Sequence, residues 1–204
     1  MSFLSRCCGY FVRSTFFLCA LGCVGFAASP VTANGDAVRG AAKVAACASC
    51  HGTPDRPPLP GMPSLAGQQP AFLVVQMFFM REGLRAVPAM DGLLKGFADR
   101  DLEDVAAYYA AQKPLPDAGK RDASLYSFGA GLSKGMGCGN CHLADYSGQR
   151  HIPRLTSQRE DYLALTLQAY RDDKRTCADT SMNAAMYGRS DSDIRALAHY
   201  FAQQ

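Results

Sequence analysis

Apolar and polar positions follow each other along much of this chain with the spacing of helices. Between residues 70 and 81, and again between residues 159 and 171, apolar side chains recur every three or four positions. Residues 102–110 and 194–202 carry a second pair of similar helical patterns. No stretch shows convincing strand alternation, so the pattern predicts an all-α protein.

One further helix is expected before each of two cysteine motifs. Residues 36–46 suit a short helix that runs into the first motif. Residues 125–136 suit the same role before the second, although several glycines lower the helix propensity there.

The two halves of the chain repeat each other. The segment PSLAGQ at residues 63–68 corresponds to PRLTSQ at residues 153–158. Met90 and Met182 each stand seven residues before a segment that leads into a final helix. Repetition at this length indicates two copies of one domain. The break falls in residues 113–119, a proline-rich linker without an apolar period.

The segment that precedes Asn34 differs from the rest of the chain. Arg6 and Arg13 precede an apolar centre at residues 16–26, and small residues follow as far as Ala33. This order is typical of a secretory signal peptide, with Asn34 as the first residue of the mature protein. The sequence therefore predicts a cleaved signal peptide at 1–33, an N-terminal domain at 34–113 and a C-terminal domain at 114–204, and it places the protein in the periplasm.

Two other interpretations of this segment are less favoured. An uncleaved membrane anchor fits less well, because Gly22, Gly25 and Pro30 leave the strongly apolar part shorter than the ~20 residues that a spanning helix needs. A lipoprotein attached through Cys23 would need a better leader than the three residues before it.

The composition argues against one class of function, nucleic-acid binding. The 204 residues carry a formal net charge of +3, which gives no sign of a nucleic-acid partner.

Cysteine usage is far more informative. Of nine cysteines, four precede Asn34, four form two CxxC pairs and Cys177 stands alone. Both pairs continue into histidine, and CxxCH is the pattern that attaches haem. Positions i, i+3 and i+4 share one helical face, so two sulfurs can bond a porphyrin edge while the imidazole reaches the iron. The predicted attachment residues are Cys47, Cys50 and His51 for one haem, and Cys138, Cys141 and His142 for the other.

Other uses of CxxC fit less well. The pairs stand roughly 90 residues apart, far from the spacing of a zinc ribbon or finger. A thioredoxin-like motif would expect a βαβ context and needs no histidine directly after the second cysteine.

Haem iron needs a second axial ligand, and a thioether suits an electron carrier because it favours reduced iron. Met90 follows His51 at nearly the same distance along the chain as Met182 follows His142, so these two methionines are the predicted distal ligands. Met186 is the competitor for Met182. The remaining candidates, Met62, Met77, Met80 and Met136, are interpreted as core-filling residues.

Cys177 is a second competitor for Met182, because it lies only a few positions before it. Met182 is favoured because it repeats the position of Met90. A thiol ligand would also need a nearby cationic group to lose its proton and become a thiolate. Pro63 and Pro153 fall where a backbone carbonyl could accept the proximal histidine's other N–H. His151 and His199 are interpreted as surface or core histidines.

The chain contains CxxCH twice, and each copy is followed by P-x-L-x-x-Q, an apolar helix, a methionine and a final helix that starts with acidic residues. This arrangement resembles the two-domain diheme class I cytochromes c of the cytochrome c4 type. The resemblance implies two tandem class I cytochrome c domains, each wrapped around one haem. It implies His51 with Met90 and His142 with Met182 as axial pairs in a periplasmic electron shuttle. Departures are Leu143 in place of a common glycine, the unusual Cys177 and the short first helix.

Three functions are consistent with such a chain to different degrees. The leading hypothesis is a non-enzymatic diheme carrier between a respiratory donor, such as quinol–cytochrome c reductase, and a terminal oxidase or reductase, with transient contacts to these membrane proteins. The alternative is the cytochrome subunit of a periplasmic dehydrogenase such as flavocytochrome sulfide dehydrogenase. A diheme peroxidase or thiosulfate dehydrogenase would need an open or unusually ligated iron, and the two methionines argue against it.

Overall fold

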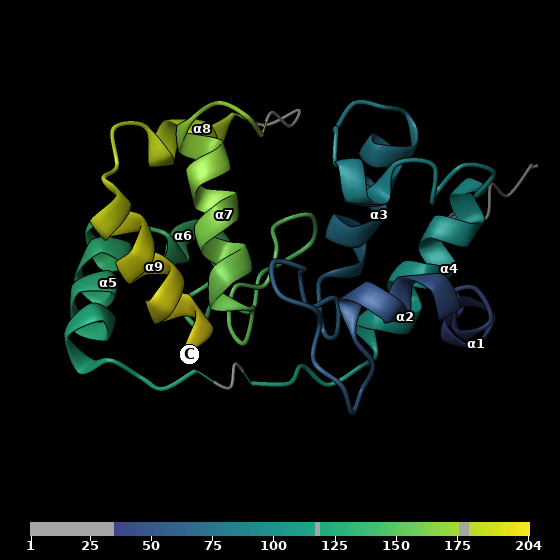
Figure 1. Cartoon of the computed structure of the whole chain (residues 1–204), viewed down its shortest axis with the longest axis horizontal. Helices are drawn as coiled ribbons and strands as arrows, with labels where there is room; N and C mark the ends of the chain where they lie inside the picture. The colour runs from purple at the N-terminus through teal and green to yellow at the C-terminus, as the bar shows by residue number, and fades with distance from the viewer. Residues whose placement is uncertain (1–34, 117–118, 176–179) are drawn as a thin grey trace, which may run out of the picture. The chain divides into compact units, whose positions relative to one another are not determined.

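The computed structural model describes residues 35–116, 119–175 and 180–204 (Figure 1). The predicted signal peptide and Cys177 lie outside these ranges. Within them the chain forms helices and no strands, with isolated bridges only between Thr53 and Arg56 and between Gln149 and Ile152. The prediction of an all-α protein is confirmed. None of the described helices is long and apolar enough to cross a membrane.

The same series of helices occurs in the N-terminal half (residues 35–116) and in the C-terminal half (residues 119–204). The N-terminal half contains α1 (Ala37–Ala41), α2 (Ala45–His51), α3 (Pro70–Arg81), the short 3-10 helix η1 (Pro88–Met90) and α4 (Asp99–Ala110). The C-terminal half contains α5 (Ala123–Gly135), α6 (Gly139–His142), α7 (Glu160–Arg171), α8 (Ser181–Met186) and α9 (Asp191–Ala202). The four helices predicted from apolar spacing are therefore confirmed.

The expected continuous helix over residues 36–46 is wrong. The chain leaves helical geometry after Ala41 and starts α2 at Ala45. The amide of Lys43 bonds the carbonyl of Gly40, three residues back, which closes a tight turn in place of a further helical turn. The first cysteine motif therefore has a short helix of its own.

Equivalent aspartates start the first helix of each half. The carboxylate of Asp36 accepts the amides of Val38 and Arg39, and that of Asp122 accepts the amides of the second and third residues after it. These bonds satisfy helix N–H groups that would otherwise lack partners. Each first helix is thus fixed at a matching place in its half.

A glycine allows the first and last helices of each half to cross closely, α1 over α4 and α5 over α9. A Cβ atom added to Gly40 would lie 2.1 Å from the carbonyl oxygen of Asp104, and one added to Gly129 would lie 2.1 Å from that of Ala196. Only glycine fits such a contact between backbones. The repeated sequence therefore builds the same crossing twice.

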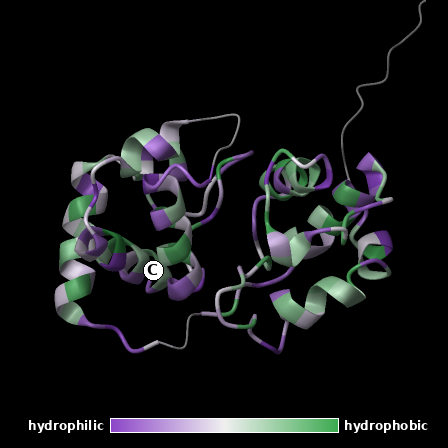
Figure 2. Cartoon of the chain, turned by 45° about the horizontal axis from the view of Figure 1, so that its top comes forward, coloured by the Kyte–Doolittle hydropathy of each residue, from purple (hydrophilic) through white to green (hydrophobic). Residues whose placement is uncertain are grey.

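Each half has an apolar core of its own, and Figure 2 shows the hydrophobic residues distributed over the helices of both. The N-terminal core consists of Val44, Leu73, Met77, Leu94, Leu102, Val105, Ala106 and Tyr109. The C-terminal core consists of Tyr146, Leu163, Leu167, Met186, Ile194, Leu197, Ala198, Phe201 and Ala202. Two separate cores match the prediction of two domains, whose boundary at residues 113–114 stays a prediction.

Candidate functional site

Both CxxCH motifs lie on helical turns, as their spacing requires. The first, residues 47–51, occupies most of α2. The second, residues 138–142, starts at the residue that caps α6 and ends with the helix. None of the four motif cysteines is joined in a disulfide. Each motif therefore presents two sulfurs and one imidazole on adjacent turns.

Both histidines of these motifs are oriented by a proline carbonyl. His51 Nδ1 lies 3.0 Å from the carbonyl oxygen of Pro63, and His142 Nδ1 lies 2.8 Å from that of Pro153. A carbonyl only accepts, so the proton is on Nδ1 and the Nε2 lone pair stays available to a metal. Burial lowers the pKa of both imidazoles, which keeps them neutral. The predicted role of the two prolines is confirmed.

The first thiol of each motif is held in its neutral form. Burial raises the pKa of Cys47 and of Cys138. A thioether bond to a vinyl group leaves a neutral sulfur, whereas zinc is bound by thiolate. Two sulfurs beside an oriented imidazole are the groups that a covalently attached haem needs.

The methionines divide into two groups. Met90 ends η1 and Met182 lies in α8, and both are only partly buried against the core of their own half. Met186, by contrast, is 2% exposed and belongs to the C-terminal core. Among the predicted core-filling methionines, that role is confirmed for Met77, Met80 and Met136.

The other two histidines, His151 and His199, lie outside the CxxCH motifs. His151 is exposed. His199 is buried, and its Nδ1 donates to Glu160 at 2.9 Å while its Nε2 accepts the amide of Asp122 at 2.9 Å. His199 therefore joins α9 to the start of α5, and the prediction of core or surface histidines is confirmed.

The sequence analysis did not predict a cluster of two arginines. Arg85 and Arg175 both donate to the side-chain oxygen of Gln76, and Arg175 also donates to the Tyr162 hydroxyl at 3.4 Å. Burial alone would raise the pKa of Tyr162, but the two guanidinium groups outweigh it and lower that pKa to about 8. Arg85 lies four positions after the arginine that ends α3, and Arg175 lies four positions after the arginine that ends α7. The internal repeat therefore indicated that these two arginines occupy equivalent positions.

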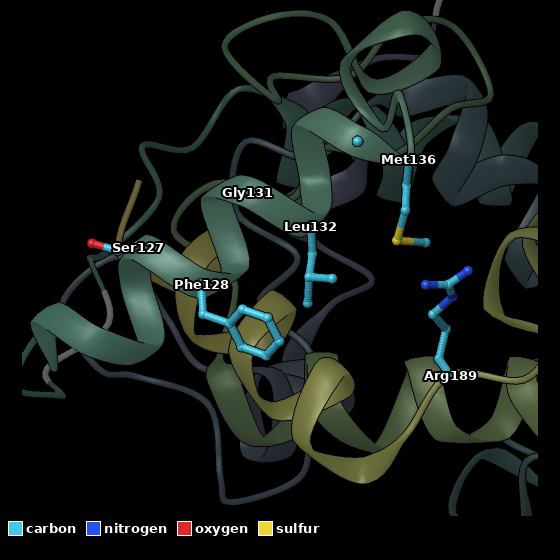
Figure 3. A pocket seen from close by; sticks show the side chains of 7 residues that line it. Ser127, Phe128, Gly131, Leu132, Met136 and Arg189 are labelled. Carbon is cyan, nitrogen blue, oxygen red and sulfur yellow. The ribbon is translucent and has the colours of Figure 1, made fainter.

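A hollow of about 410 Å³ lies along α5 in the C-terminal half. One face of α5 lines it together with Arg189, and Figure 3 shows the side chains of Met136 and Arg189 reaching toward each other across it. Met136 stands two positions before Cys138. The C-terminal half therefore has a hollow along α5 that is lined largely by apolar side chains.

No protein-family model matches this chain. Over 194 residues it is 36% identical to cytochrome c4 of Pseudomonas aeruginosa, in an alignment that spans 90% of this chain and 94% of that protein. The chain belongs to the cytochrome c4 family. The crystal structure of reduced recombinant cytochrome c4 from Pseudomonas stutzeri superposes with a TM-score of 0.77 at 34% identity, covering 83% of this chain and 98% of that one. A thiosulfate dehydrogenase electron acceptor of Stutzerimonas stutzeri is 29% identical over 169 residues, which cover 77% of this chain and 78% of that protein.

Membership in the cytochrome c4 family confirms the fold predicted from the sequence, two tandem class I cytochrome c domains. It also confirms the cofactor, because cytochromes c4 carry two covalently bound c-type haems. The chain is therefore a diheme c-type cytochrome that transfers single electrons.

Proposed function

We propose that the two CxxCH motifs hold the two haems and that their histidines are the proximal ligands. Cys47 and Cys50 would bond the first haem, with His51 and Met90 as axial ligands. Cys138 and Cys141 would bond the second, with His142 and Met182 as axial ligands. The observation that carries this proposal is the repeated bond from a motif histidine to a proline carbonyl, which leaves Nε2 free to bind iron.

Haem bound in this way supplies a one-electron iron couple. The chain's own residues orient and tune it. The Nδ1–H bond to a proline carbonyl fixes the imidazole plane and raises its basicity. A neutral methionine thioether as the second ligand would favour reduced iron and raise the potential, as an electron carrier needs.

Arg85 and Arg175 suit the acidic groups of haem. Both guanidinium groups converge on the amide oxygen of Gln76, so positive charge is concentrated in a buried place. Burial lowers the pKa of Arg85, and the nearby charge of Arg175 lowers it further. Haem carboxylates beside this cluster would relieve that repulsion.

The proposed role is a periplasmic shuttle, exported with cleavage after Ala33, between a donor such as quinol–cytochrome c reductase and a terminal oxidase or reductase. Encounters of this kind are brief and steered by charge, so their rates fall with rising ionic strength. The test is stopped-flow mixing of the purified, reduced protein with solubilised oxidase. Second-order oxidation that slows with salt supports the shuttle, and no reaction at any ionic strength contradicts it.

A second candidate is a dedicated partner of a dehydrogenase. One relative is named as a thiosulfate dehydrogenase electron acceptor, which favours this possibility. A permanent subunit, as in flavocytochrome sulfide dehydrogenase, would copurify with a catalytic chain through an apolar interface. Purification of the native protein under mild conditions separates the two candidates, because a shuttle elutes alone.

A further inference from the structure

Two buried glutamines cross between the halves, which belong to one compact unit. Gln158 Oε1 accepts the backbone N–H of Ser64 at 2.7 Å, and its Nε2 donates to the backbone carbonyl of Ser64 at 3.0 Å. Gln68 makes the same two bonds to Arg154, at 2.7 and 3.0 Å. All four residues are at most 7% exposed. The exchange is reciprocal because both glutamines come from the repeated P-x-L-x-x-Q segment.

The hydrogen-bond partners fix the orientation of both side-chain amides. Besides the bond across the halves, Gln158 Oε1 accepts the amide of Arg159 at 3.0 Å, and Gln68 Oε1 accepts the amide of Gln69 at 2.9 Å. A flipped amide would turn its NH₂ group toward two N–H donors. Each glutamine therefore acts as an acceptor toward the N–H group of the other half.

That N–H group belongs to the peptide that orients the motif histidine. The N–H of Ser64 and the C=O of Pro63 are the two ends of one peptide group, and the C=O end accepts the Nδ1–H of His51. The N–H of Arg154 and the C=O of Pro153 have the same relation to His142. A continuous line of hydrogen bonds thus runs from a glutamine of one half to the motif histidine of the other.

We propose that each of these glutamines tunes the haem of the opposite half. The inference rests on the proposed ligation of iron by His51 and His142. An N–H group that donates polarises its peptide and makes the attached carbonyl a stronger acceptor, and in a buried site this effect is larger. A stronger acceptor makes the imidazole more electron-rich, which stabilises oxidised iron and lowers the potential. Gln158 therefore lowers the potential of the haem at His51, and Gln68 lowers that of the haem at His142.

Gln69 provides a matched control. Its Nε2 donates to the carbonyl oxygens of Ser147 at 2.9 Å and Gly148 at 3.0 Å, so it also crosses between the halves. Its side-chain hydrogen bonds go to these two carbonyls and not to the two peptides that orient the histidines. A role limited to joining the halves would be shared by all three glutamines, whereas the tuning role belongs to Gln68 and Gln158 alone.

The test uses the complete holoprotein and the variants Gln158→Leu, Gln68→Leu and Gln69→Leu. Spectroelectrochemical titration gives both potentials, and the hyperfine-shifted methyl signals of the oxidised protein identify each haem. Gln158→Leu should shift the oxidation equilibrium of the haem at His51 about threefold toward the reduced form, equal to about 30 mV for one electron. Gln68→Leu should do the same at His142, and Gln69→Leu should shift neither. A shift in the haem of the mutated half, equal shifts in both haems, or the same shifts in Gln69→Leu would overturn the proposal.

Two further measurements on the unmodified protein complete the test. Its absorption and resonance signals show first whether two histidine-ligated haems are present. Their absence defeats the proposed function, whereas their presence with the wrong pattern of shifts defeats only this inference. In the reduced protein, the amide protons of Ser64 and Arg154 should exchange with deuterium slowly, and rapid exchange would overturn the inference even if a variant failed to fold.

Discussion

The two halves build one architecture but fasten its first helix in different ways. In the N-terminal half, α1 has only five residues, and Arg39 and Lys43 bind it to Asp104 on α4. In the C-terminal half, α5 has thirteen residues and contacts α9 through aromatic rings, with Tyr126 and Tyr200 centroids 5.0 Å apart. A helix too short to bury an apolar face can thus be held by charge, while a longer one uses apolar contact.

Asp104 is the centre of that difference. Its carboxylate accepts Arg39 Nε at 2.8 Å, Arg39 Nη2 at 2.7 Å, Lys43 Nζ at 2.9 Å and the amide of Asp36 at 2.8 Å. The hydrogen bonds from Arg39 and Asp36 hold the pKa of this carboxyl well below its usual range, against the opposing effect of burial. The matching position in the C-terminal half is Ala196, which has no charge to contribute. Acid should therefore affect the two halves unequally.

The largest expected effect concerns the distal ligands, for which the halves should behave alike. Met90→Ala and Met182→Ala should each abolish the thioether-to-iron charge-transfer band of one haem and lower its potential by roughly 0.1 V, a fraction of the ~0.8 V range that axial ligands span. Near-infrared spectra and redox titration measure both effects. If the second haem keeps its charge-transfer band in the Met182→Ala variant, Met182 is not its distal ligand.

Two controls sharpen the choice of Met182. Met186→Ala should keep the band but lower the unfolding free energy by about 2–5 kcal/mol, because it opens a cavity in the C-terminal core. Cys177→Ser should leave ligation and potential unchanged. A change of ligation in Cys177→Ser would instead identify Cys177 as the distal ligand of the second haem.

The next effect tests the close crossing that both halves share. Gly40→Ala and Gly129→Ala should each lower the unfolding free energy by about 1–3 kcal/mol, since the added methyl group meets a backbone carbonyl. Gly131 lies on the same helix as Gly129, but a Cβ there meets nothing within 4 Å. Gly131→Ala should therefore stabilise the protein by about 0.5–1 kcal/mol. Denaturant titration measures all three, and a tolerated Gly129→Ala would remove the argument for a glycine-dependent crossing.

The sequence predicted what repeats locally, and it missed what depends on contacts between distant segments. Apolar spacing defined α3 correctly, and the CxxCH motifs located two helical turns. The break between α1 and α2 was missed, because helix propensity favours continuation and only the local bonds of the folded chain show the turn. The bonds between Gln68 and Arg154 join segments 86 residues apart, which no periodicity encodes.

The smallest expected effect is a difference in acid sensitivity between α1 and α5. A carboxyl whose folded pKa is depressed stabilises the protein above its unfolded pKa, near 4, and that contribution is lost as the pH falls toward the folded pKa. The protection factors of the α1 amides, which compare each exchange rate with that of the unfolded chain at the same pH, should therefore fall severalfold more than those of the α5 amides between pH 7 and pH 3. The N-cap aspartates, Asp36 and Asp122, are common to both helices and do not account for a difference.

Asp104→Asn isolates the cause of that acid sensitivity. In this variant the protection factors of the α1 amides should be low at both pH values, with little remaining pH dependence, while those of α5 are unchanged. Glu103→Gln, next to Asp104 on α4, is the control and should retain the behaviour of the unmodified protein. Equal acid sensitivity of α1 in the Asp104→Asn variant would mean that other carboxyl groups are responsible.

The central claim, that both halves are haem sites built on their CxxCH motifs, is tested most directly by intact mass after acid–acetone extraction. Extraction removes haem that is not covalently bound, so the remaining mass counts the attached groups. The unmodified protein should carry the mass of two haems above its polypeptide, and replacing Cys47 and Cys50, or Cys138 and Cys141, by alanine should remove one haem in each case. A single haem or none on the unmodified protein, or two haems on either double variant, would contradict the account.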